Sequence, residues 1–228
     1  MTQNNEETAQ DSPVITPDVG SCYGHGWQQM LKYILELLLI TIIFILISIP
    51  AGGLSAADEF EGPDAFFLVI FSLAYSILIV WPIEYGVDFA FLKAARGEKV
   101  DVKDMFEVFQ NYLNAVFASL LVAILVGIGI AFCIVPGIII ACKLAFVPYL
   151  VVDRKMEAIE AIKESWRMTT GHATTVFLIG LLAIPIFILG LLCCGVGAVG
   201  SIMWITLAFA SLYHSVRTQE VQVQNDLA

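Results

Sequence analysis

Apolar residues dominate this chain in six long runs that are separated by short polar segments. A membrane-spanning helix needs about 20 predominantly apolar residues, because each residue advances the helix by about 1.5 Å across about 30 Å of hydrocarbon. The runs have lengths close to this value, so the pattern predicts an all-α integral membrane protein with six transmembrane helices. They cover approximately residues 30–49, 65–91, 113–135, 137–152, 173–192 and 196–216.

Turn residues divide these runs into hairpins. Pro50 and the glycines after it end the first run, Pro136-Gly137 joins the third run to the fourth, and Cys193-Cys194-Gly195 joins the fifth to the sixth. Small residues at 55–57 would allow cleavage of the first run as a signal peptide. The long acidic segment before that run favours a retained span, and so does the length of the apolar run itself, which exceeds that of a signal-peptide core.

The polar ends of the chain complete the predicted domain organisation. Residues 1–20 are polar and acidic with no apolar period, which predicts a disordered acidic tail. A polytopic helical membrane domain follows at 21–217, and a short polar C-terminal tail occupies 218–228.

Basic residues lie almost entirely on one side of the predicted membrane. The segments 93–112 and 153–172 each contain four of them, Lys32 precedes the first run, and Arg217 follows the last. Lys143 is the exception. Because loops rich in Lys and Arg stay in the cytoplasm, both connectors and both termini are predicted to be cytoplasmic.

The composition agrees with a membrane protein and argues against a nucleic-acid partner. Hydrophobic residues make up 59% of the 228 residues and charged residues 14%, whereas a soluble domain carries about 25% charge. The net charge is −10, and each basic connector also contains four acids, so no strongly basic patch remains. The predicted partners are membrane lipid, other membrane proteins or a second copy of the chain.

Both cytoplasmic connectors have amphipathic patterns that predict interfacial helices. Apolar residues recur at helical spacing opposite charged ones, and Asp101 is placed to cap the first helix. Such helices lie in the membrane interface with their aromatic residues at headgroup depth. They either seal the bundle or form a specific lipid or partner site. The predicted interfacial anchors are Phe106, Phe109 and Trp166.

The connectors also suggest an internal repeat. The order span, amphipathic connector, span occurs around 102–113 and again around 156–167. The segment 26–30, which leads into the first run, is a candidate for a third and degenerate copy.

Several short motifs between residues 85 and 217 resemble a broad group of bacterial integral membrane proteins, which includes YciC-like proteins and the membrane domain of some glycerophosphodiester phosphodiesterases. The resemblance implies a polytopic helical fold in a bacterial inner membrane. It implies no catalysis, because the phosphodiesterase chemistry belongs to a separate soluble domain. The motifs are Arg96-Gly97-Glu98, Val135-Pro136-Gly137-Ile138, Pro148-Tyr149, Val152-Asp153, Ala161, Ser165-Trp166, Thr169 and Gly171-His172.

Three charged residues fall inside the predicted spans, where an ionised group costs roughly 2.5–3.5 kcal/mol at the helix centre. Glu84 and Asp88 share one helix face two and six residues after Pro82, and Lys143 lies in the short fourth run. They are candidates for a polar cavity or ion path. The alternative is that Asp88 reaches the interface and that the other two form a buried pair.

No established catalytic, cofactor-binding or metal-binding motif is found in the sequence. The five cysteines lack zinc-site spacing, and the three histidines lie at predicted span ends without a second ligand nearby. We therefore predict a non-enzymatic membrane protein that acts as a scaffold, partner or lipid-organising factor. The alternative is a small-solute transporter or channel that uses the three charged residues, and a membrane enzyme ranks last.

Overall fold

A computed structural model describes residues 16–52, 63–192 and 196–226, and every regular element within these ranges is a helix. Six helical stretches are long and apolar enough to cross a membrane, which confirms the predicted all-α multi-pass class. The elements are α1 (Val19–Lys32), α2 (Ile34–Ser48), η2 (Ile49–Gly52), α4 (Pro63–Tyr75), η4 (Ser76–Val80), α5 (Trp81–Ala95), η5 (Val102–Asn111), α6 (Tyr112–Phe132), α7 (Ile134–Lys143), α8 (Val147–Asp153), α9 (Ala158–Met168), α10 (Ala173–Leu192) and α11 (Val196–Asp226).

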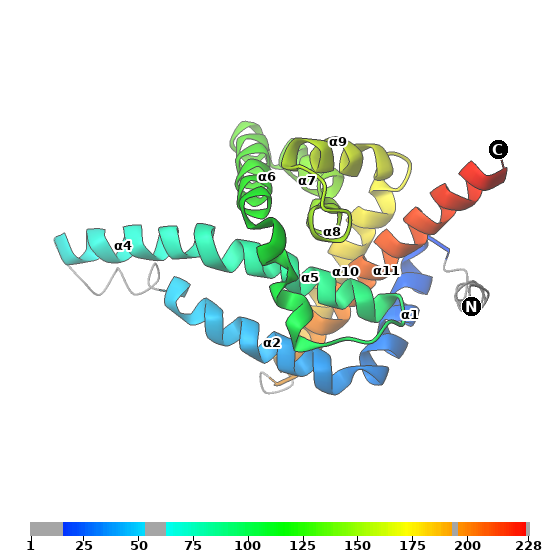
Figure 1. The fold of residues 1–228 in the computed structure, drawn as a ribbon, viewed down its shortest axis with the longest axis horizontal. Helices are drawn as coiled ribbons and strands as arrows, with labels where there is room; N and C mark the ends of the chain where they lie inside the picture. Colours follow the sequence, from blue (N-terminus) through cyan, green and yellow to red (C-terminus); the bar gives the residue numbers. More distant parts are fainter. Residues whose placement is uncertain (1–15, 53–62, 193–195, 227–228) are drawn as a thin grey trace.

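The helices follow one order three times: an amphipathic helix, then two apolar spans that form a hairpin. The three units are α1 with α2 and α4–α5, η5 with α6 and α7–α8, and α9 with α10 and α11 (Figure 1). Each amphipathic helix packs on the second span of another unit: η5 on α5, α9 on α8, and α1 on α11. The helix order thus extends the suggested repeat to a third unit, and α1 closes the arrangement into a ring.

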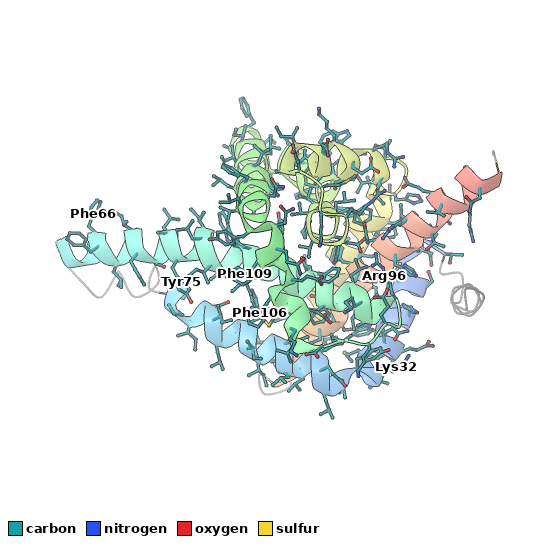
Figure 2. All side chains as sticks on the ribbon, viewed as in Figure 1. Lys32, Phe66, Tyr75, Arg96, Phe106 and Phe109 are labelled. Carbon is teal, nitrogen blue, oxygen red and sulfur yellow. The ribbon has the colours of Figure 1, made fainter. Side chains whose placement is uncertain are left out.

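The three hairpins converge at one end of the molecule and separate at the other. Phe91, Phe146 and Tyr213 are fully buried near the convergent ends of α5, α8 and α11. At the far ends, Phe66 and Phe132 are 63% and 87% exposed. In Figure 1, α4 extends to the left and α6 extends upward, and Figure 2 shows Phe66 at the distant end of α4. The core is therefore confined to the end that carries the amphipathic helices.

Small residues bring the two helices of a hairpin into close contact. A Cβ added to Gly129 on α6 or to Gly137 on α7 would overlap the facing helix. At the third hairpin, a Cβ on Gly190 would overlap Ser201, whose hydroxyl donates a hydrogen bond to the Ile186 carbonyl oxygen at 3.1 Å. Close backbone approach is how membrane helices gain packing energy without a hydrophobic driving force.

A π-helical segment interrupts the second span where the sequence contains a proline. Pro82 has no N–H and leaves the carbonyl group of Leu78, four residues earlier, without its helical partner. The hydroxyl of Tyr112 donates to that carbonyl oxygen at 2.6 Å. The segment η4 (Ser76–Val80) lies just before this proline, so Pro82 changes the helix geometry without ending the span.

Helices continue into both predicted polar ends of the chain. Helix α1 begins at Val19 inside the predicted acidic tail, and the Asp18 carboxylate accepts a hydrogen bond from the Gly20 N–H at 3.1 Å. Helix α11 continues through the predicted polar C-terminal tail to Asp226. Residues 1–15, and the predicted turn at Cys193-Cys194-Gly195, lie outside the described residues.

Candidate functional site

Residues from three helices meet at one carboxylate. Asp153 at the end of α8 accepts two hydrogen bonds from the Arg96 guanidinium, at 2.7 and 2.8 Å. Arg217 on α11 donates to the same carboxylate at 2.6 Å, and the Tyr213 hydroxyl donates at 3.3 Å. Arg96 directly follows α5, so this Arg96–Asp153–Arg217 junction links all three units of the fold.

The junction is largely withdrawn from the surface. The side chains of Arg96 and Asp153 are 15% and 9% exposed, respectively. Burial alone would lower the pKa of the Arg96 guanidinium, but the hydrogen bonds and negative charge of Asp153 outweigh burial and hold that pKa above its ordinary value. Two arginines around one aspartate give a local charge of +1. The junction is therefore a strong positional constraint on the helix ends.

A break divides the fourth span next to this junction. Helix α7 ends at Lys143 and α8 starts at Val147, which leaves backbone groups without intrahelical partners. The Ser165 hydroxyl on α9 serves as both a hydrogen-bond donor and an acceptor for these backbone groups. It donates to the Lys143 carbonyl oxygen at 2.8 Å and accepts from the Phe146 N–H at 3.2 Å. Thr169 adds a further hydroxyl 3.2 Å from the Lys143 oxygen. The amphipathic helix α9 thus stabilises the break.

A cavity of about 350 Å³ lies beside the break and contains two of the predicted polar residues. Glu84 and Asp88 line it from α5, Ser119 lines it from α6, and Pro148 lines it from α8. Glu84 is exposed and Asp88 is half-buried. Neither carboxylate forms an ion pair with another residue in the described ranges. The structure therefore brings two of the three intramembrane charges together.

Lys143 does not line this cavity. Its ammonium donates to the Thr170 hydroxyl at 3.0 Å and lies 5.7 Å from the centre of the Trp166 ring. The sequence places Lys143 inside a continuous span, but the break makes it the last residue of α7. A cation at a helix C-terminus is favoured by the helix dipole. Lys143 is half-buried, and its polar partner comes from the segment that follows α9 and not from the cavity.

The first predicted anchor helix has a different geometry from the expected one. Asp101 caps it as predicted, through a capping box with Asp104, but η5 is a 3₁₀ helix, in which every third residue shares a face. Met105 and Val108 form the buried row. Phe106 and Phe109 stack on the exposed side, with ring centres 6.2 Å apart (Figure 2).

The second anchor helix, α9, also turns its large apolar residues outward. Its buried residues are small or polar apart from one methionine: Ala158, Ala161, Ser165 and Met168. Trp166 is 46% exposed, and Ile159 is 60% exposed. The predicted apolar stripes of both connectors therefore divide into a buried row and an outward row. The outward aromatic residues are Phe106, Phe109 and Trp166, and their anchoring role stays a prediction.

Charge pairs cover the polar side of α9. Glu164 forms ion pairs with Arg167 at 2.8 Å and with Arg154 at 3.4 Å, and Arg167 also contacts Glu220 on α11 at 3.1 Å. The hydrogen bond from Arg167 lowers the pKa of the Glu164 carboxyl group. Within the described ranges, no group of three His, Cys, Asp or Glu residues is arranged to hold a metal ion. This face therefore presents paired charges, which supply binding groups but no evident reaction centre.

Sequence reasoning missed the junction because Arg96 and Arg217 were read as determinants of orientation, and Arg96 and Asp153 as motif residues, without a contact between them. The available indication was positional, because Arg96, Asp153 and Arg217 follow the predicted second, fourth and sixth apolar runs, with opposite charges at corresponding places. The motif residues Ser165 and Thr169 likewise gave no hint of the helix break that they stabilise.

The chain matches one described family over most of its length. Residues 68–224 match the profile of a domain of unknown function, DUF7847. The chain belongs to this family. The match includes the junction, the helix break and the cavity, whereas α1 and α2 of this DUF7847 chain lie outside it. Neither a curated protein nor a solved structure matches the chain.

Proposed function

We propose that this protein is a non-enzymatic scaffold of the bacterial inner membrane, whose separated hairpins hold lipid and other membrane proteins. The observation that carries this proposal is the confinement of the core to one end of the molecule. Of the 18 consecutive residues that represent each span, 56% are buried in α11 but only 17% in α2 with η2 and 17% in α10. The outer spans thus offer most of their apolar surface to neighbours in the membrane.

The orientation is part of the same proposal. Lys93 lies in the last turn of α5, three further basic residues follow that helix, four follow α8, and Arg217 lies in the second half of α11. This bias supports cytoplasmic termini and a cytoplasmic core. The resemblance to YciC-like proteins supports the inner membrane as the location. In this arrangement the rigid junction is at the cytoplasmic face, and the hairpins extend outward through the bilayer.

Photocrosslinking in intact cells tests the scaffold proposal. A photoreactive phenylalanine analogue at Phe177 faces an apolar groove of about 380 Å³ between α7 and α10, whereas the same analogue at Phe146 is buried in the core. We expect Phe177 to give discrete protein adducts of defined mass and Phe146 to give only intramolecular ones. The proposal would be contradicted if no protein adduct formed at Phe177 or at the exposed Phe66 and Phe117.

The cavity supports a second candidate function, transport of a small cationic solute. Its supporting observation is that Glu84 and Asp88 share one cavity beside a broken helix, and unpaired carboxylates favour a cation. Lys143 takes no part in this version of the hypothesis, because it contacts Thr170 and Trp166 instead.

Flux measurements in reconstituted vesicles distinguish the two functions. A scaffold should give no proton, sodium or potassium flux above that of protein-free vesicles. A transporter should give a flux that Asp88→Asn abolishes and that Glu160→Gln, an exposed acid on α9, leaves intact. An Asp88-dependent flux would therefore replace the scaffold proposal.

A further inference from the structure

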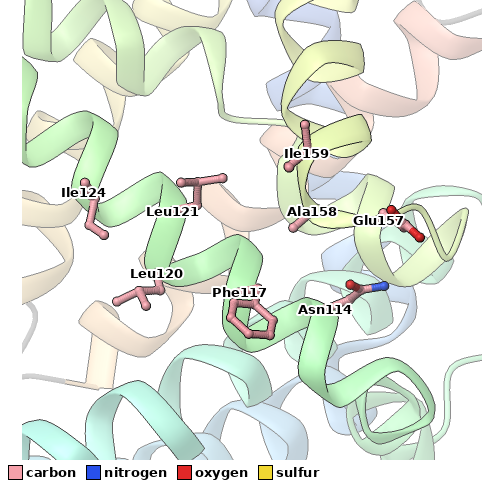
Figure 3. A pocket seen from close by; sticks show the side chains of 8 residues that line it. All are labelled: Asn114, Phe117, Leu120, Leu121, Ile124, Glu157, Ala158 and Ile159. Atoms are coloured by element: carbon pink, nitrogen blue, oxygen red, sulfur yellow. The ribbon is translucent and has the colours of Figure 1, made fainter.

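A second groove, of about 300 Å³, lies between the membrane span α6 and the amphipathic helix α9. Figure 3 shows its lining side chains, with Asn114 and Glu157 together at one end. Phe117, Leu121 and Ile124 continue along α6 away from that end. We call this feature the α6–α9 groove. It is polar at one end and apolar along the rest of its length.

The direction of the groove matches that of a lipid. Helix α6 starts at Tyr112 beside the convergent core and runs outward to Phe132. Asn114 therefore lies near the interfacial helices, and Ile124 lies ten residues further along α6, about 15 Å deeper in the hydrocarbon. An acyl chain that lies along α6 would place its headgroup next to Asn114 and Glu157.

The charged and polar groups at this end select the headgroup. Glu157 is exposed and forms no ion pair within the described part of the chain, so its carboxylate is free for a cation. Asn114 donates to the side-chain oxygen of Asn111 at 3.0 Å, and the buried amide nitrogen of Asn111 has no partner. Asn111 does not line the groove, but Asn114 does, and its amide has a second N–H for an acceptor ligand such as a phosphate oxygen.

A basic residue lies close to the same end. The ammonium of Lys155 donates to Gln110 at 3.0 Å, and Gln110 precedes Asn114 by four residues at the junction of η5 and α6. No basic residue lines the α6–α9 groove itself. A zwitterionic headgroup fits this pattern, with its amine on the carboxylate and its phosphate towards the amide and Lys155. A purely anionic headgroup would meet Glu157 unfavourably.

We infer that the α6–α9 groove binds a glycerophospholipid with a primary-amine headgroup, with one acyl chain along α6 and the ammonium on Glu157. This extends the scaffold proposal, in which lipid is one of the molecules held, by naming the lipid and its site. The test uses purified protein and defined lipids. A negative result in this lipid-binding test would therefore leave the photocrosslinking result in cells unaffected. A negative photocrosslinking result would likewise leave the lipid-binding result unaffected.

Native mass spectrometry of the delipidated full chain gives the first test. Phosphatidylethanolamine, phosphatidylcholine and phosphatidylglycerol with identical acyl chains are added in equal amounts. We expect a preference for the ethanolamine lipid that Glu157→Gln reduces about tenfold, because a charge-assisted hydrogen bond to the ammonium is lost. Glu160→Gln, an exposed acid outside the groove, is the matched control and should retain the preference.

A second pair of variants fixes the location. Leu121→Trp fills the groove and should abolish the preference, whereas Ile128→Trp adds the same ring to α6 at a position that is 51% exposed and outside the groove. Equal binding of the three lipids by the unaltered chain would overturn the inference. Equal losses in Glu157→Gln and Glu160→Gln, or an unchanged preference in Leu121→Trp, would also overturn it.

Discussion

Replacement of Asp153 by asparagine should lower the free energy of unfolding by about 3 kcal/mol. The change keeps the shape of the side chain but removes the charge that pairs with Arg96 and Arg217. Loss of one partner from a buried ion pair leaves an uncompensated charge, which is strongly destabilising. Thermal unfolding of the purified protein in detergent, followed by circular dichroism, measures the effect.

Glu164→Gln is the matched control for this prediction. Glu164 also contacts two arginines, but the side chain of Arg167 is 60% exposed and that of Arg154 is 38% exposed. Exposed ion pairs contribute about 1 kcal/mol or less, so the control should unfold close to the unaltered protein. Adding Arg96→Met to Asp153→Asn should recover part of the loss, since one unpaired guanidinium is removed. Equal unfolding temperatures for Asp153→Asn and Glu164→Gln would show that the junction does not stabilise the fold.

Addition of a single methyl group at Gly86 should destabilise the protein by roughly 2–3 kcal/mol, the upper part of the usual range for an overpacked core. Gly86 lies on α5 where η5 crosses it, and a Cβ there would overlap the carbonyl group of Met105. Met105 is fully buried, and the capping box at Asp101 fixes the start of η5. Neither helix can move without disturbing these contacts. Unfolding temperature and the yield of monodisperse Gly86→Ala protein are the measurements.

Gly127→Ala provides the comparison on a different span. No heavy atom lies within 4 Å of a Cβ placed at Gly127, and alanine is favoured over glycine in a helix by about 1 kcal/mol. This variant should be as stable as the original chain or slightly more stable. If Gly86→Ala matched Gly127→Ala in both measurements, the close contact between α5 and η5 would be ruled out.

The sequence predicted the number and approximate limits of the spans because hydropathy acts locally along the chain. It failed where contacts between residues far apart in the sequence determine the backbone conformation. The apolar run 137–152 hides the break after Lys143, since Ser165 and Thr169 stabilise that break from another helix. Only Pro148, shortly after the break, hinted at it locally.

The candidate site was predictable to a similar extent. The four-residue spacing of Glu84 and Asp88 placed them on one helix face, and the structure puts both in one cavity. Lys143 could not be placed from its sequence position, because its environment depends on the break. The row of Phe106 and Phe109 was expected to lie on the same face as Met105. The 3₁₀ geometry of η5, where Gly86 allows its backbone to approach α5, separates the two rows.

The ring of units has a consequence for the synthesis of the chain. Helix α1 leaves the ribosome before α11, yet most of the residues against which it packs belong to α11. The Tyr23 carbonyl oxygen accepts a hydrogen bond from the Trp204 ring N–H at 2.9 Å, 181 positions later in the chain. Helix α1 therefore lacks its main packing partner until α11 has been synthesised. A chain that stops before α11 would leave the face of α1 that carries Tyr23 without its covering helix.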